Sequence, residues 1–380
     1  MIGEIKWMKT VYDIMQEKNA DFNRAVFMQK QSLPYEAKVI HAKVRAIEFY
    51  NEIVGTRGEN VHVSVGGLDS ITLLMFLRKV CHLDVPAISV SSLEDKSIQA
   101  IHRQLGVETL KPLKSKVEVL NECGFPVLSK EIAGKIKLLQ NPSEKNRTVR
   151  HAIITGETGA YGGNRTGSRM RMSQKWLDKF GGADAEGAEL GYSAAPFKVS
   201  DRCCYYLKER PCDLWAKAHH SHPYLGLMAS EGGRRAKSLA MNGCNYYSPS
   251  ATRSAPFAIF SRNDLLQLAL ELHVPVPEIY GEIVRDPDGA LRTTKAQRTG
   301  CSMCGFGIHL EKRPHRFDRL RESNPAEWEF WMYNCVTDAV TGEKYGWGRV
   351  LDYIGVEWED DPTGNIKGQM DMWEEAKWTI

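Results

Sequence analysis

The pattern that most constrains this fold is an alternation of short β-branched runs with helical segments between residues 61 and 113. The runs "VHVSV" (61–65) and "VPAISVSS" (85–92) have the composition of buried strands, and "VETLKPL" (107–113) is a third strand candidate. The segments between them, 69–82 and 94–106, carry apolar residues at helical spacing. This order predicts an α/β fold with an open, mostly parallel sheet and helices on both faces, because parallel strands need crossover connections.

The flanking regions differ from this core in pattern. Residues 1–55 are predicted to form a helical N-terminal region, and residues 311–380 a mainly helical, aromatic-rich C-terminal region. Residues 261–274 also have helical spacing, with Ser261 as the predicted cap. A glycine-rich insertion at about 140–195 has little periodicity, and its arginines and lysine at 165, 169, 171 and 175 make it basic. A solvated insert and a substrate lid are both compatible with it.

Charge and hydropathy limit the classes of partner. The formal net charge is +3, so the whole chain offers no electrostatic argument for nucleic acid or membrane. No run of eighteen apolar residues occurs, and the N-terminal stretch has acids and lysines where a signal peptide needs an apolar segment. We therefore expect a cytoplasmic protein without a membrane partner. In a reducing cytosol its nine cysteines need a reason other than structural disulfides.

A glycine pair follows the first predicted strand. Gly66 and Gly67 let the backbone approach a ligand, and the dipole of the helix that follows favours negative charge. Asp69 and Ser70 stand at the start of that helix, where they either cap it or hold a magnesium ion or phosphate. With Ser64 and Leu68, these residues form the predicted phosphate-binding segment.

Four cysteines have the spacing of a metal centre. Cys203 and Cys204 are adjacent, and Cys301 and Cys304 form a C-x-x-C. Four thiolates suit a [4Fe–4S] cluster or a tetrahedral zinc ion. Two buried cysteine pairs without a metal are the alternative.

Four segments together resemble one protein family. "SVGGLDS" (64–70) resembles the S-G-G-x-D-S pyrophosphate loop of the ATP pyrophosphatase superfamily, with Val65 where that loop has its first serine. "CCYYLKERP" (203–211) resembles the C-C-x-x-x-K-x-x-P of iron–sulfur proteins in the phosphoadenosine phosphosulfate (PAPS) reductase family. "GLMASEGGRR" (226–235) and "TGCSMCGFG" (299–307) resemble that family's strand-and-turn element and its closing cysteine pair. The segments occur in the family's order, which assigns residues 56–310 to a PAPS reductase-like domain.

The resemblance implies both a fold and a chemistry. It implies a Rossmann-like nucleotide-binding sheet, and it favours an iron–sulfur cluster on the four cysteines. It also implies that ATP binds at the loop and that Asp69, Ser70 and Arg235, with Mg²⁺, support adenylation of an acceptor for sulfur transfer. Nucleic acid as acceptor and a sulfur-donor protein are the partners implied, and a homo-oligomer is left open.

Two other functions share this scaffold. A sulfonucleotide reductase acting on PAPS or adenosine phosphosulfate (APS) would need a nucleophilic cysteine in an E-C-G-x-H motif, and the last 45 residues contain no cysteine. A catalytically idle nucleotide-binding iron–sulfur module acting through a partner is favoured by Val65 and by Met228, which stands where the family commonly has arginine. The ATP-using enzyme is the preferred prediction.

Overall fold

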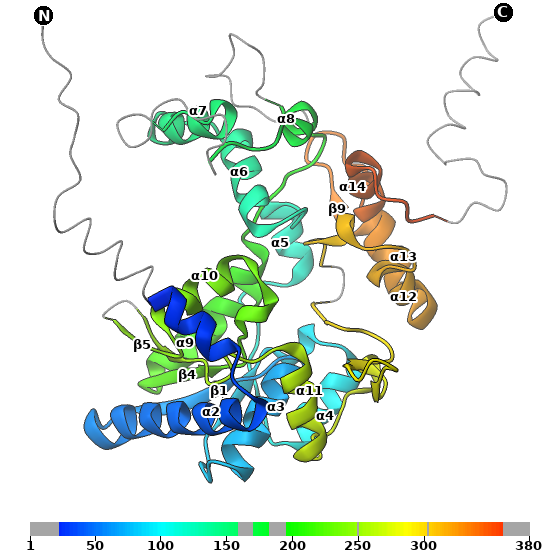
Figure 1. Cartoon of the computed structure of the whole chain (residues 1–380). Coiled ribbons are helices and arrows are strands. Elements are labelled where there is room, and N and C mark those ends of the chain that lie inside the picture. The colour runs from blue at the N-terminus through cyan, green and yellow to red at the C-terminus, as the bar shows by residue number, and fades with distance from the viewer. Residues whose placement is uncertain (1–22, 159–169, 182–194, 249–250, 302–303, 360–380) are drawn as a thin grey trace, which may run out of the picture. The chain divides into compact units, whose positions relative to one another are not determined.

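The structure, a computed structural model, describes residues 23–158, 170–181, 195–248, 251–301 and 304–359. Contacts along the chain separate two compact units (Figure 1). Unit 1 comprises Met1–Leu113 with Lys208–Cys301, and unit 2 comprises Lys114–Leu207 with Ser302–Ile380. The segment predicted as one PAPS reductase-like domain thus contributes residues to both units, and the C-terminal region groups with residues 114–207. No sequence pattern indicated that grouping.

Unit 1 is built on a six-stranded sheet with the strand order β3-β2-β1-β4-β6-β5. The strands are β1 (Asn60–Ser64), β2 (Ala87–Ser89), β3 (Glu108–Thr109), β4 (Ser221–Leu225), β5 (Asn245–Ser248) and β6 (Ala251–Ser254). Neighbouring strands are parallel except for β5, which runs antiparallel to β6. The predicted open, mostly parallel α/β sheet is confirmed.

Helices of unit 1 pack on both faces of this sheet (Figure 1). They are α2 (Tyr35–Tyr50), α3 (Leu68–Lys79), α4 (Lys96–Gln104), α9 (Arg210–Ala218), α10 (Gly233–Asn242) and α11 (Arg262–Glu271). Successive side chains of a strand point to opposite faces. Val61 and Val63 of β1 accordingly join the buried core that includes residues of α2 and α3, whereas the ring of His62 contacts Trp215 of α9.

The connections of β1 indicate which edge of the unit 1 sheet is suited to ligand binding. From β1 the chain passes through α3 to β2 on one side, and β4 pairs with β1 on the other. The order of strands therefore reverses at β1, which is the point where open α/β sheets bind ligands at their carboxyl ends. The residues that follow Ser64 of β1 and Leu225 of β4 lie at this edge.

Unit 2 has its own core, made mainly by helices. These are α5 (Lys116–Cys123), α6 (Lys130–Gln140), α7 (Arg147–Thr155), α8 (Gln174–Phe180), α12 (Arg316–Ser323), α13 (Pro325–Glu329) and α14 (Trp347–Ile354). A short antiparallel pair, β9 (Val336–Thr337) and β10 (Lys344–Tyr345), joins them. The mainly helical C-terminal region is thus as predicted for residues 311–354.

The glycine-rich insertion contains more regular structure than its sequence predicted. Helices α7 and α8 both lie inside it, because Ile153 and Ile154 on one and Trp176, Leu177 and Phe180 on the other are buried in the core of unit 2. Its basic positions 165 and 169 lie outside the described residues. The weak periodicity of the insertion therefore gave no indication of these two helices, whose apolar stripes are only two turns long.

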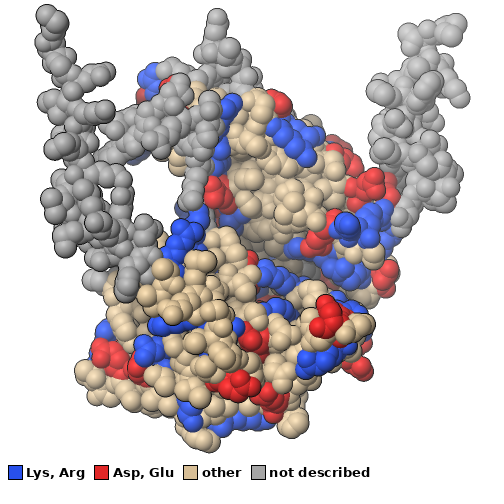
Figure 2. Space-filling model, viewed as in Figure 1, with Lys and Arg blue, Asp and Glu red and all other residues tan. Residues whose placement is uncertain are grey.

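The hydropathy of the helices is relevant to a membrane partner, and the charge distribution on the surface is relevant to a nucleic-acid partner. None of the helices in the described ranges combines the length and the apolar character that a membrane crossing requires. Figure 2 shows basic and acidic side chains interspersed over the face of unit 1 that is in view. This distribution matches the small net charge of the chain.

Candidate functional site

The glycine loop between β1 and α3 is braced by its own serine. Ser70 Oγ accepts a hydrogen bond from the N–H of Gly66 (2.7 Å) and donates one to the carbonyl of Gly67 (2.9 Å). The N–H groups of Gly67 and Asp69 have no hydrogen-bond partner among the described residues. They lie at the N-terminus of α3, where the helix dipole favours an anion.

Two glycines allow the elements around this loop to approach closely. A Cβ on Gly67 would lie 2.2 Å from Tyr280 Oη and 3.0 Å from Thr299 Oγ1. A Cβ on Gly226, directly after β4, would lie 2.9 Å from both the Cα and the N of Ser70. The contacts at 2.2 Å from Gly67 and at 2.9 Å from Gly226 are too short for any side chain. The start of α3 can therefore lie against the end of β4 because residue 226 is a glycine.

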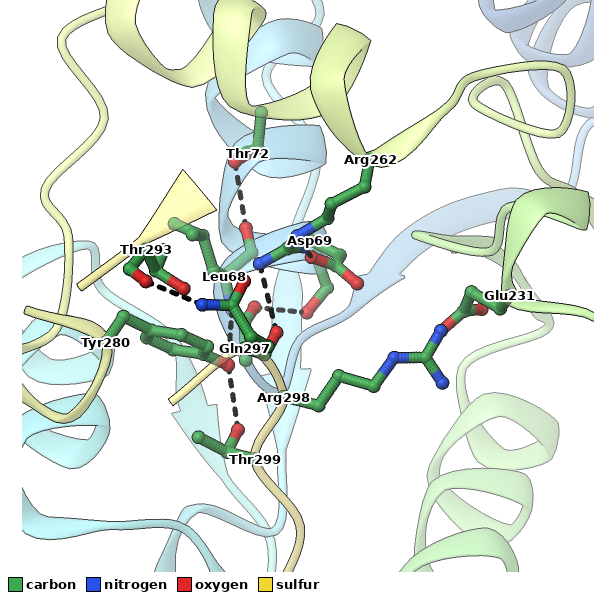
Figure 3. Close-up of polar contacts among 12 residues, drawn as sticks. Leu68, Asp69, Thr72, Glu231, Arg262, Tyr280, Thr293, Gln297, Arg298 and Thr299 are labelled. Carbon is green, nitrogen blue, oxygen red and sulfur yellow. Dashed lines mark hydrogen bonds and ion pairs between the residues drawn. The ribbon is translucent and has the colours of Figure 1, made fainter. Parts of the chain in front are cut away.

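Asp69 is paired with an arginine that the sequence did not indicate. Its carboxylate forms an ion pair with Arg262, the first residue of α11, and Arg262 Nη2 also donates to the carbonyl of Gln297 (3.2 Å; Figure 3). Burial raises the pKa of Asp69, although the guanidinium of Arg262 opposes the rise. A carboxylate in such surroundings favours a cationic partner.

Tyr280 contacts the start of α3 through its hydroxyl group. Its hydroxyl accepts a hydrogen bond from the N–H of Leu68 (3.1 Å) and shares a second one with Thr299 Oγ1 (2.7 Å; Figure 3). The residue is 3% exposed. Tyr280 therefore fixes the first turn of α3 to the segment that leads into the C-x-x-C.

Arg235, the predicted catalytic arginine, is held by an acid of the same turn. Its guanidinium bonds both carboxylate oxygens of Glu231 (2.7 Å each), and Arg298 lies 3.5 Å from the same carboxylate. The Glu231 side chain is 8% exposed. The charges of Glu231 and Arg298 both influence the pKa of Asp69, which places this cluster within electrostatic reach of the loop (Figure 3).

A histidine supports the loop from the side of β2. His102 of α4 hydrogen-bonds the carbonyl of Gly66 through Nε2 and Ser91 Oγ through Nδ1, both at 2.8 Å. Because a carbonyl only accepts, Nε2 carries the proton and Nδ1 accepts from the serine. Burial lowers the pKa of His102 and so favours this neutral form. No sequence motif indicates this contact, which spans 36 positions of the chain.

The four cysteines are described in part. Cys203 and Cys204 begin a helical stretch that continues as the π-helix η5 (Tyr205–Glu209), a type of segment frequent at functional sites. Lys208 Nζ contacts Glu94 Oε1 at 2.5 Å, and although burial opposes it, the charges of Cys301 and Glu94 raise the pKa of Lys208.

In the part of the chain that the structure describes, the four cysteines do not form a metal centre. In the described ranges, which leave out residues 302 and 303, no group of three or more His, Cys, Asp or Glu is arranged to hold a metal ion. The set of Cys203, Cys204, Cys301 and Cys304 stays a prediction.

Comparisons with known proteins add no identification. A scan against models of known protein families finds no match, and a search of curated proteins finds none either.

Proposed function

We propose that this chain is an adenine-nucleotide-binding enzyme of the PAPS reductase family, with unit 1 as a Rossmann-like domain of the ATP pyrophosphatase type. The observation that carries the proposal is the glycine loop at the strand-order reversal, where the amides of Gly67 and Asp69 are available at the N-terminus of α3. Backbone amides at a helix N-terminus are a common phosphate site. The order of the four sequence motifs supports the same assignment.

The proposed reaction is adenylation of an acceptor. An acceptor oxygen attacks the α-phosphorus of ATP, the bond from that phosphorus to the bridging oxygen breaks, and pyrophosphate leaves with the electron pair. The amides of Gly67 and Asp69 and the guanidinium of Arg235 would stabilise the charge on the phosphates. The carboxylate of Asp69 has the oxygen donors that Mg²⁺ prefers, and a bound Mg²⁺ would neutralise phosphate charge.

Sulfur transfer would follow adenylation, with a sulfur nucleophile displacing AMP from the acceptor. Nucleic acid as acceptor and a sulfur-donor protein are the proposed partners. We assign Cys203, Cys204, Cys301 and Cys304 as ligands of a [4Fe–4S] cluster, with zinc as the alternative. The order of the two cysteine motifs in the sequence supports this assignment.

Sulfonucleotide reduction is the second candidate, and the surroundings of Cys335 disfavour it. This thiol is 1% exposed and donates to the carbonyl of Trp331 (3.3 Å). Burial raises its pKa to about 12, so the nucleophilic thiolate is disfavoured. Cys335 belongs to the core of unit 2.

A catalytically idle module is the third candidate, and its two motif departures have a packing explanation. Val65 and Met228 are 6% and 2% exposed, and both belong to the core of unit 1. Their side chains therefore pack among apolar residues instead of facing a ligand. This burial explains the apolar residues without requiring loss of nucleotide chemistry.

The chemistry is tested by assaying pyrophosphate release from ATP, with and without nucleic acid, beside thiol-dependent sulfite release from PAPS. We expect pyrophosphate from the wild-type protein and a decrease of about a hundredfold in Asp69→Ala, because the carboxylate that would hold Mg²⁺ is removed. Asp288→Ala, which removes an exposed acid of unit 1, is the matched control and should retain full activity. Sulfite without pyrophosphate would establish the reductase instead, and nucleotide binding without either product would establish the idle module.

A further inference from the structure

Arg262 supplies the positive charge that balances the carboxylate of Asp69. One nitrogen of its guanidinium pairs with the carboxylate, and another donates to the carbonyl of Gln297. The side chains of Asp69 and Arg262 are 27% and 29% exposed, so solvent reaches both. A ligand arriving at the loop therefore meets this ion pair directly (Figure 3).

The backbone of Arg262 is fixed, whereas its side chain has two partners that can be exchanged. Ser261 caps α11 as predicted, and its Oγ accepts from the N–H of Asp264 (3.2 Å). Asp264 in turn forms a buried ion pair with Lys38 of α2 (2.8 Å). With the start of α11 anchored in this way, the guanidinium can change partners by side-chain rotation alone.

The backbone amide next to Asp69, that of Leu68, also has a side-chain partner within the protein. The N–H of Leu68, at the first helical position of α3, is taken by the hydroxyl of Tyr280, as described above. Two polar groups of the loop, one acid and one amide, are thus satisfied by side chains from residues 262–280. A nucleotide must compete with these internal partners when it binds.

We infer that Arg262 is a binding residue for a magnesium nucleoside triphosphate that exchanges partners: it leaves Asp69 when the metal arrives and pairs with the polyphosphate instead. This inference rests on the proposed function. A half-buried carboxylate and a guanidinium both lose free energy if left unpaired. The exchange keeps both charges paired, because Mg²⁺ replaces the guanidinium at Asp69 and phosphate oxygens replace Asp69 at the guanidinium.

The surrounding charges favour a strongly anionic ligand. The cluster contains two carboxylates and three guanidinium groups, which belong to Asp69, Glu231, Arg235, Arg262 and Arg298. One positive charge is therefore in excess before any metal binds. A triphosphate that brings Mg²⁺ satisfies all these groups, whereas a ligand without a metal leaves Asp69 facing phosphate once Arg262 has moved.

The inference is tested by measuring the dissociation constant of ATP, with and without Mg²⁺, for the wild-type protein, Arg262→Gln and Arg262→Lys. In Arg262→Gln we expect the metal-free constant to rise about tenfold or more, because Asp69 is then unneutralised and repels the phosphates. In saturating Mg²⁺ the rise should be about threefold or less, since the metal neutralises Asp69 and only the contact of Arg262 with the phosphates is lost. Arg262→Lys should lie closer to wild type because it retains the charge.

The control is Arg57→Gln, which removes an arginine of unit 1 paired with Glu52 and should leave both constants unchanged. Equal weakening of ATP binding with and without Mg²⁺ in Arg262→Gln would assign Arg262 a purely structural role and overturn the inference. Unchanged binding under both conditions would also overturn it. If the wild-type protein binds no ATP, the proposed function fails instead, so the two failures are distinguishable. Should Arg262→Gln not fold, Arg262→Lys alone still tests the inference: weaker binding confined to the metal-free condition supports it, and equal weakening in both conditions contradicts it.

Discussion

Replacing Gly226 with alanine is expected to weaken nucleotide binding by roughly ten- to a hundredfold, because a displaced Asp69 amide loses a hydrogen bond to charged phosphate worth about 1.5 to 3 kcal/mol. The new Cβ would lie 2.9 Å from the Cα and N of Ser70 and 3.0 Å from the carbonyl carbon of Asp69. All three atoms belong to the backbone, so no flexible side chain can move aside. The first turn of α3 must shift, and the amide of Asp69 moves with it.

Gly55→Ala is the matched control for this substitution. A Cβ on Gly55, in the π-helix η1 (Asn51–Thr56), meets no atom within 4 Å. Both variants should be compared by equilibrium binding of ATP and by urea denaturation. We expect Gly226→Ala to lower the free energy of unfolding by about 1 to 3 kcal/mol and Gly55→Ala to leave binding intact. Wild-type affinity in Gly226→Ala would show that the close approach of β4 and α3 does not position the loop.

Replacing Trp347 with alanine should lower the free energy of unfolding of unit 2 by about 3 to 5 kcal/mol, the range found for large aromatic side chains in cores. Trp347 is fully buried at the start of α14, and its ring contacts Phe125 (centroids 4.9 Å apart) and Phe317 (5.4 Å). The ring also fills the space beside Gly305, where a Cβ would lie 2.2 Å from it. Its removal leaves a cavity next to the segment that follows Cys304.

Phe330→Ala tests whether this effect comes from burial. Phe330 belongs to the same unit and is 39% exposed, so its loss should cost much less than that of Trp347. Thermal and urea denaturation of both variants give the comparison. Similar destabilisation by the two substitutions would contradict the view that α14 is held in unit 2 mainly by the buried ring of Trp347.

Local sequence patterns predicted the parts of the fold that depend on neighbouring residues. The strand and helix around residues 61–82 followed from β-branched composition and helical spacing, and the cap at Ser261 followed from its residue type. The two glycines after β1 predicted a close approach of the backbone to a ligand, which stays a prediction; the structure places Tyr280 Oη and Thr299 Oγ1 beside Gly67. The strand, helix, cap and glycine patterns each depend on residues that are close together in the sequence.

The partners of the loop could not be predicted in this way. Arg262 is 193 positions from Asp69, and Tyr280 is 212 positions from Leu68. Neither residue lies in a recognisable motif, because the folding of the chain alone brings them to the carboxyl edge of β1. Helices α7 and α8 escaped prediction for a different reason, since short apolar stripes within glycine-rich sequence give weak periodicity.

We propose that the loop from Gly66 to Ser70 binds an adenine nucleotide through its backbone. Amide hydrogen exchange of the full chain, measured with and without saturating ATP and Mg²⁺, tests this most directly. The amides of Gly67 and Asp69, which have no partner among the described residues, should exchange at least about tenfold more slowly when ATP is bound. Binding of ATP with unchanged exchange at these two amides, and protection elsewhere in the chain, would contradict the account.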